Sequence, residues 1–291
     1  MKFGVFTVGM PEYTPEDGVK LLKELGYDGV EWRIAEVPKE VPQNVPHSGR
    51  YWANNKCTID VNTVEEQAEF LAELSKKYGV ECFALASYLR PSQIDKIEAV
   101  MHAAQIIGAP KVRIFQEGYS SSDTQKNYRL GMAECRAQLL AIEPLCRKYG
   151  VKVILEMHHN TLVSSPSAAY NLLCGLDSNC FGINIDPGNM VFEGFENYQK
   201  AFELLGAYID HVHVKNAIRA EAGRDEYGSK IFKDTWAPLW DGSADLRELF
   251  RVLRKFGYEG TVSVEDFTDE QPTKEKLACD LAYMKKLLAS V

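Results

Sequence analysis

Short runs rich in Val, Ile and Phe alternate with longer segments of helical period, and this alternation constrains the fold more than any other feature of the sequence. Eight such cycles follow one another, and each expected strand precedes a helix-length segment. Strict alternation predicts a parallel sheet with right-handed crossovers, and eight units over 291 residues fit a closed (β/α)8 TIM barrel better than an open doubly wound sheet. The expected strands are 2–8, 29–34, 82–87, 111–116, 151–158, 181–186, 211–216 and 261–266.

The expected helices have recognisable ends. The stretches "ELGYDG", "KKYGVE", "IIGAPK", "RKYGVK" and "RKFGYEG" each place a Gly just past an amphipathic segment, as a left-handed helix cap requires. No linker or shift in composition divides the chain. We therefore expect one domain over residues 1–291.

Charge and composition exclude several classes of partner. The formal net charge is -8, so the protein has no basic field for collecting phosphates, and neither nucleic acid nor an anionic membrane is an expected partner. No apolar run approaches the ~20 residues of a membrane helix, and "MKFGVFTV" has no signal-peptide pattern. The 7 Cys are scattered without a CxxC pair, which favours reduced thiols. We expect a cytoplasmic protein.

Two segments, 35–60 and 217–246, are too long to be simple connections. Both run from a strand to a helix, on the face where barrel enzymes place their sites. Solvated decoration is one interpretation. The aromatic residues Tyr51, Trp52, Trp236 and Trp240 equally favour a lid or rim that covers a substrate.

Polar residues interrupt the ends of the last four expected strands. Successive side chains of a strand alternate sides, and the apolar ones must face the helices, so the intervening polar ones point into the barrel. This parity rule brings Glu156, Asp186, His213 and Glu265 to one mouth of the barrel.

Three carboxylates at short range in a partly dry pocket are costly unless a cation neutralises them. A divalent metal ion is the favoured interpretation, because one His with several carboxylates suits Mn²⁺, Mg²⁺ or Co²⁺, and zinc is less favoured. The alternative is a set of salt bridges to Lys215, Arg33 and Arg113.

Several motifs carry a family resemblance: "GYDGVEWR", "LEMHH", "NIDPGN", "HVHVKN", "LWDGSADL" and "SVEDF". Together they span nearly the whole chain, which resembles the sugar isomerase/epimerase superfamily of xylose-isomerase-like TIM barrels. The resemblance implies that Glu156, Asp186, His213 and Glu265 are the ligands of one divalent ion.

Two departures from the family pattern limit the chemistry. Epimerases and endonucleases of the superfamily commonly have a His three residues after the ligand Asp, where this chain has Asn189. The trinuclear endonuclease also needs an Asp-x-His pair near "DGSAD", where this chain has Ser243. A three-zinc phosphodiesterase is therefore not expected.

A metal that holds two vicinal oxygens of a hydroxy-ketone eases removal of the proton between them and stabilises the resulting enediolate. Glu156 and Glu265 come from non-adjacent strands and fit the roles of acid and base, as the resemblance to ketose 3-epimerases also implies. We expect an isomerase or epimerase acting on an unphosphorylated sugar, keto-sugar or cyclitol, since no Gly-rich phosphate turn follows the last two strands. An inosose-type lyase and a non-catalytic sugar-binding barrel are the alternatives.

Four residues are candidate substrate ligands: His158, Asn189, Lys215 and Arg219. His158 shares the inward parity of Glu156, and Arg219 matches, by resemblance, an arginine that binds substrate oxygens in epimerases. Each has a structural alternative: outer support of the metal for His158, a plain turn for Asn189, an ion pair for Lys215, and a solvated loop position for Arg219.

Two further expectations concern neighbouring positions. We expect His159 to face away from the mouth, and Glu31 and Arg33 to pair with each other. The sequence leaves the oligomeric state open, although relatives that this chain resembles are often dimers or tetramers.

Overall fold

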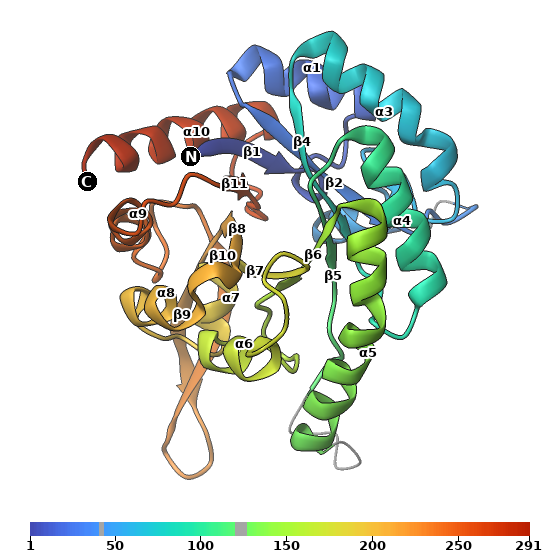
Figure 1. Ribbon diagram of the computed structural model, residues 1–291. Helices are drawn as coiled ribbons and strands as arrows, with labels where there is room; N and C mark the ends of the chain where they lie inside the picture. The colour runs from blue at the N-terminus through green and yellow to red at the C-terminus, as the bar shows by residue number, and fades with distance from the viewer. Residues whose placement is uncertain (41–43, 120–126) are drawn as a thin grey trace.

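The computed structural model describes residues 1–40, 44–119 and 127–291. Eight parallel strands close into a barrel, because β1 pairs with β11 at one side and with β2 at the other. The predicted single-domain TIM barrel is therefore confirmed (Figure 1). The barrel strands are β1 Lys2–Phe6, β2 Gly29–Ala35, β4 Glu81–Ser87, β5 Lys111–Ile114, β6 Lys152–Glu156, β7 Phe181–Ile185, β8 Ile209–Val214 and β11 Thr261–Val264.

Amphipathic helices surround the strands and bury their apolar faces against them (Figure 1). The expected glycines end four of these helices in the left-handed conformation: Gly26, Gly79, Gly108 and Gly150. None of the described helices combines the length and apolar character that a membrane span requires. The outer helices are α1 Pro15–Leu25, α3 Val64–Tyr78, α4 Ile94–Ile107, α5 Tyr128–Tyr149, α6 Pro166–Leu173, α8 Tyr198–Leu205, α9 Leu246–Lys255 and α10 Thr273–Ala289.

Most of the strands are shorter at the mouth than the sequence suggested. Glu156 is the last residue of β6, and Asp186 and Glu265 lie one residue beyond β7 and β11. Asp186 leaves the sheet because it caps the short helix α7 (Pro187–Phe192), where its carboxylate accepts a hydrogen bond from the backbone N–H of Asn189 at 2.9 Å. The ligand-type side chains therefore stand at the rim, where the backbone turns away.

The two long segments contain regular structure that their length alone did not predict. Segment 35–60 includes a 3₁₀ turn His47–Gly49, helix α2 Arg50–Ala53 and the short strand β3 Ile59–Asp60, while residues 41–43 lie outside the described part of the chain. Segment 217–246 is largely an antiparallel hairpin of β9 Asn216–Arg224 and β10 Lys230–Ala237, which projects from the barrel (Figure 1).

The hairpin forms because its tip has the chemistry of a tight turn. The Asp225 carboxylate accepts hydrogen bonds from the backbone N–H groups of Tyr227 and Ser229, at 2.9 and 2.8 Å. Gly228 supplies the positive φ of +83° that the turn requires.

At the opposite, N-terminal end of the barrel, an aromatic ring packs closely against two glycines. Phe83 of β4 packs against the bare backbones of Gly4 and Gly29 on β1 and β2. A Cβ at Gly29 would lie 2.1 Å from Cε1 of Phe83, closer than any real contact.

We therefore predict that Gly29→Ala destabilises the barrel by about 1–3 kcal/mol, the usual cost of overpacking a filled core. Urea denaturation measures the change. Combining it with Phe83→Leu should recover part of the loss, because the smaller side chain gives way. Gly9→Ala is the control, since its Cβ would meet only the backbone oxygen of Asp266 at 3.8 Å. Equal unfolding midpoints for Gly29→Ala and the control would contradict this packing.

Candidate metal centre

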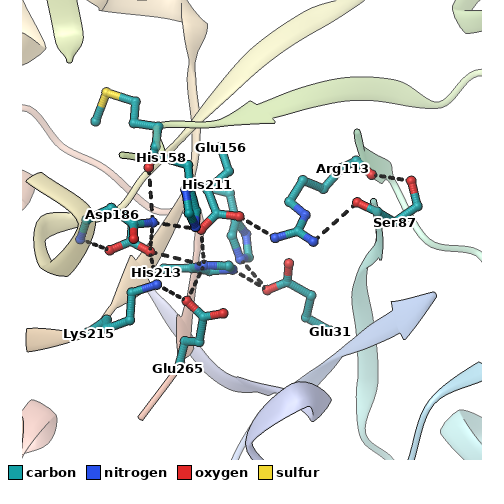
Figure 2. Close-up of polar contacts among 12 residues, drawn as sticks. Glu31, Ser87, Arg113, Glu156, His158, Asp186, His211, His213, Lys215 and Glu265 are labelled. Carbon is teal, nitrogen blue, oxygen red and sulfur yellow. Dashed lines mark hydrogen bonds and ion pairs between the residues drawn. The ribbon is translucent and has the colours of Figure 1, made fainter. Parts of the chain in front are cut away.

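The four predicted ligands converge at the C-terminal mouth of the barrel (Figure 2). One oxygen or nitrogen from each of Glu156, Asp186, His213 and Glu265 lies within 4.8 Å of all the others. The four side chains come from β6, β8 and the ends of β7 and β11, which are consecutive around the sheet. All four are at least 97 % buried, since their exposed fractions are 1 %, 0 %, 0 % and 3 %.

His213 faces the centre of this group through Nδ1. That atom lies 3.6 Å from Glu156 Oε1, 3.7 Å from Asp186 Oδ2 and 3.5 Å from Glu265 Oε2, yet it has no hydrogen-bond partner. The other ring nitrogen, Nε2, lies 2.9 Å from Glu31 Oε2. Assigning the proton to Nε2 leaves a lone pair on Nδ1, directed at the three carboxylates, as a metal-binding imidazole requires.

Glu31 holds that imidazole in place from across the barrel. It accepts hydrogen bonds from His213 and from His211 Nε2, the latter at 3.0 Å. Burial alone would raise the pKa of Glu31, but the two imidazoles hold it well below its ordinary range. The expected pairing of Glu31 with Arg33 is wrong, because Arg33 instead donates to the Thr58 hydroxyl and to a backbone carbonyl.

The carboxylates also act on His213 itself. Burial opposes protonation, but Glu31 and the three converging carboxylates raise the pKa of His213 well above its ordinary value. A proton and a metal ion would therefore compete for Nδ1, which is the usual coupling between metal binding and ligand protonation.

Two cations contact the cluster. Lys215 Nζ lies 2.8 Å from Asp186 Oδ2 and also bonds Glu265, while Arg113 pairs with Glu156. The expected salt bridges of Lys215 and Arg113 are thus present, and that of Arg33 is not found among the described residues. Four carboxylates, those of Glu31 and the three ligands, face two cations in this buried region, which leaves a formal charge that one divalent ion would neutralise.

The donor set fits a hard divalent ion. One imidazole nitrogen and three carboxylates with unshared oxygen lone pairs suit Mn²⁺, Mg²⁺ or Co²⁺, and Zn²⁺ also binds such ligands. The orphaned nitrogen of His213 and the charge imbalance are the observations that carry this fit.

Asn189 and the two histidines after β6 lie beside the cluster. The Asn189 amide donates to Asp186 Oδ2 at 2.8 Å and to Glu156 Oε1 at 3.1 Å, and its oxygen accepts from His159 Nδ1 at 3.0 Å. His159 was expected to face away, and this is wrong because β6 ends at Glu156, so strand alternation no longer applies beyond it. His158 is half-buried and donates to the carbonyl of His159.

The structure does not bring Arg219 to the cluster. Its side chain is 53 % exposed on the hairpin strand β9, where its Nε lies 3.9 Å from Asp234 Oδ1 and its guanidinium covers the Phe232 ring. A substrate role for Arg219 stays a prediction.

A closed cycle of aromatic rings lies above the cluster. Neighbouring centroids are 4.3–6.3 Å apart, within the range of favourable aromatic pairs. The rings follow seven of the eight barrel strands, so the cycle surrounds the mouth, and Lys215 Nζ lies 4.8 Å from the Trp236 centroid. We call this cycle the aromatic collar; its members are Trp52, Tyr88, Phe115, His158, His159, Phe192, Trp236 and Phe267.

The collar only partly matches the four aromatics that the sequence singled out. Trp52 and Trp236 belong to it. Tyr51 is buried and donates to Asp269, and Trp240 lies near Tyr283 of α10. The remaining collar residues lie after the ends of barrel strands. That position in the sequence could have been used to predict that they surround the mouth.

Residues 19–287 match the family of xylose isomerase-like TIM barrels, and the chain belongs to this family. Among curated relatives, the inosose dehydratase of Clostridium perfringens is 28 % identical over 129 residues, which cover 42 % of each chain. The 3-dehydroshikimate dehydratase of Bacillus anthracis is 25 % identical over 166 residues, covering 55 % of this chain and 58 % of the relative. The match thus spans 42 % and 58 % of the length of these two relatives.

Solved structures share the whole fold at low sequence identity. The IolI protein with a bound zinc atom has a TM-score of 0.72 and 16 % identity, with 100 % of this chain and 99 % of that chain covered. D-psicose 3-epimerase from Clostridium cellulolyticum H10 has a TM-score of 0.71 and 13 % identity, with 99 % of each chain covered. At these identities the likeness shows the fold alone.

We predict one divalent ion per chain, measurable by elemental analysis of the purified protein. A chelator should lower the melting temperature, because an ion that binds only the folded state stabilises it. Asp186→Asn should lose most of the ion, since it removes one ligand charge while keeping the side-chain shape. Full metal occupancy in both Asp186→Asn and Glu156→Gln would show that the four-ligand assignment is wrong.

Glu31→Gln should weaken metal binding about 10- to 100-fold without removing a ligand, because partners behind a ligating imidazole orient it and raise its basicity. Competition with a fluorescent chelator measures the affinity. Glu81→Gln on the exposed end of β4 is the matched control, since Glu81 pairs with Lys2 at the far end of the barrel. Unchanged affinity in Glu31→Gln would remove Glu31 from the site.

Proposed function

We propose that the chain is a divalent-metal-dependent isomerase that moves a proton beside the carbonyl group of an unphosphorylated sugar, keto-sugar or cyclitol. The single observation that carries this proposal is His213 Nδ1, a buried nitrogen without a partner that faces three carboxylates. A bound ion would hold two neighbouring oxygens of the substrate and make the C–H between them more acidic.

Glu265 is the better placed base of the two glutamates. Its Oε2 bonds Lys215, and no hydrogen bond to its Oε1 is found among the described residues, so that oxygen is available to a substrate proton. Glu156 has no such freedom, because Arg113 binds its Oε2 and the Asn189 amide donates to its Oε1. Burial favours a neutral Glu156, but Arg113 and His213 hold its pKa well below the ordinary value.

This asymmetry favours chemistry that needs one base. An aldose-ketose isomerisation returns the proton to the adjacent carbon, so one carboxyl group can serve as base and then as acid. An epimerisation at one carbon needs two groups on opposite faces, and Glu156 would have to leave Arg113 to be the second.

A lyase of the inosose-dehydratase type is the second candidate. Lys215 is 2 % exposed and bonds both Asp186 and Glu265, so its ammonium group lies where it can protonate a departing hydroxyl group. The curated relatives quoted above are both dehydratases, which supports the same chemistry. In this reaction Glu265 takes the proton from carbon, the β-hydroxyl leaves as water, and a C=C bond forms.

The aromatic collar serves either reaction. Its rings can pack against the C–H face of a sugar or cyclitol ring while keeping water from the reacting carbon. His158 lies in the collar between Phe115 and His159, and it is our candidate for a hydrogen bond to a substrate hydroxyl.

Incubating the metal-loaded protein with keto-sugars and inososes in D2O tests the proposal. Deuterium in an isomerised product supports the isomerase, and loss of water from the substrate supports the lyase. Ligand-induced thermal stabilisation with no deuterium exchange in any of these compounds would indicate a non-catalytic sugar-binding barrel and contradict both.

Glu265→Gln should lower the exchange rate by roughly a hundredfold or more, the usual worth of a positioned proton-transfer group. Glu156→Gln should weaken metal binding but keep measurable exchange at saturating metal. Mass spectrometry of the recovered substrate measures both rates. Equal losses in the two variants at saturating metal would show that both glutamates transfer protons, as an epimerase requires.

A further inference from the structure

A cavity of about 330 Å³ opens beside the mouth of the barrel, between the end of β2 and helix α2. Trp52 of the aromatic collar forms one wall and is 46 % exposed, and Val37 lines the outer part. Arg33 lines the cavity with a side chain that is 94 % buried, as only 6 % of it is exposed. None of the metal-centre ligands lines this cavity, and Trp52 is the collar residue that the cavity and the mouth share.

Within the described part of the chain, the Arg33 guanidinium carries a buried charge without an anionic partner. Nη1 donates to Thr58 Oγ1 at 2.5 Å and Nη2 to the Trp52 carbonyl at 3.4 Å, while Nε has no hydrogen bond. A guanidinium has five N–H donors, so most of its capacity is unused. No carboxylate lies within 4 Å of it among the described residues.

The other charged residues of the lining do not neutralise the positive charge of Arg33. Glu36 is the acidic residue of the lining, and it is already paired with Lys96 at 3.0 Å. Lys56 at the rim has no carboxylate partner within the described ranges. Asn54 adds a buried side-chain oxygen that lacks a donor. In a chain of net charge -8, this is a local site suited to an anion that also carries a hydroxyl group.

The cavity lies close to the metal centre. The Arg33 guanidinium is 5.3 Å from the centroid of Tyr88, and the Arg113 guanidinium, which pairs with Glu156, is 4.8 Å from the same ring. Trp52 also contacts Phe267, whose ring lies 5.4 Å from Lys215 Nζ. One small molecule can therefore reach the metal centre with one end and Arg33 with the other.

We infer that the substrate is a hydroxy-ketone with a carboxylate at the end remote from its carbonyl group, and that Arg33 binds this carboxylate. The inference rests on the proposed function for the position of the carbonyl, whereas the anion site itself stands on the cavity alone. A carboxylate is favoured over a phosphate because one guanidinium fork can match both of its oxygens, whereas a phosphate would keep a further oxygen and a second charge without a partner.

Three probes that differ only at C6 test this choice: D-fructuronate with a carboxylate, D-fructose with a hydroxymethyl group and D-fructose 6-phosphate. Isothermal titration with the metal-loaded wild-type protein should show D-fructuronate binding at least tenfold more tightly than D-fructose, as a charge-assisted hydrogen bond implies. Tighter binding of the phosphate ester than of D-fructuronate, or equal binding of D-fructuronate and D-fructose, would overturn the inference.

Variants locate the effect. Arg33→Met should weaken D-fructuronate binding about 10- to 100-fold and leave D-fructose binding and metal occupancy unchanged. The affinity of Arg33→Lys for D-fructuronate should lie between those of the wild type and Arg33→Met, because lysine keeps the positive charge but loses the two parallel N–H donors of the guanidinium. Arg247→Met, on the exposed face of α9, removes the same charge and should change nothing. An equal loss for both sugars in Arg33→Met would overturn the assignment of the carboxylate to Arg33.

The readouts separate this inference from the proposed function. Deuterium exchange into D-fructose, without tighter binding of D-fructuronate, would contradict this inference and support the proposed isomerase. Selective binding of D-fructuronate that depends on Arg33, with no deuterium exchange in any sugar, would support the anion site and contradict the proposed chemistry.

Discussion

The concentration of negative charge at the mouth of the barrel is the constraint on which the site depends. Glu31, Glu156, Asp186 and Glu265 are all buried, and such carboxylates are stable only with compensating charge. Arg113 and Lys215 supply part of it. The pairing of Glu31 with His213 turns Nδ1 toward the other three carboxylates and leaves that nitrogen without a partner. A metal ion bound there would supply the remaining positive charge.

The ligand positions lie where the regular strands of the barrel end. The strands end at or just before the ligand positions, so the carboxylates stand where the backbone turns into loops. Loops on this face of the barrel, after seven of its eight strands, supply the rings of the aromatic collar. The N-terminal end of the barrel is tightly packed, because Phe83 lies against the bare backbones of Gly4 and Gly29.

The alternation of strand-like and helix-like segments was enough to predict the fold. Strand parity was enough to place Glu156, Asp186, His213 and Glu265 at one mouth, because side-chain alternation is a local property of the sequence. It failed at His159, which lies beyond the end of β6. Parity also could not predict which residues meet across the barrel. Glu31 and His213 are 182 positions apart in the sequence, and the closed sheet brings them together. The hairpin and the collar depend in the same way on how loops pack after the barrel has formed.

The most direct test of the metal centre is a crystal structure of the protein soaked with Mn²⁺, with anomalous diffraction data that locate the ion. The account predicts one ion bound by His213 Nδ1 and by oxygens of Glu156, Asp186 and Glu265, at distances of about 2.0–2.3 Å. Lys215 should then have moved away from at least one of its two carboxylates. An ion bound elsewhere, or no ion while Lys215 still bridges Asp186 and Glu265, would contradict the account.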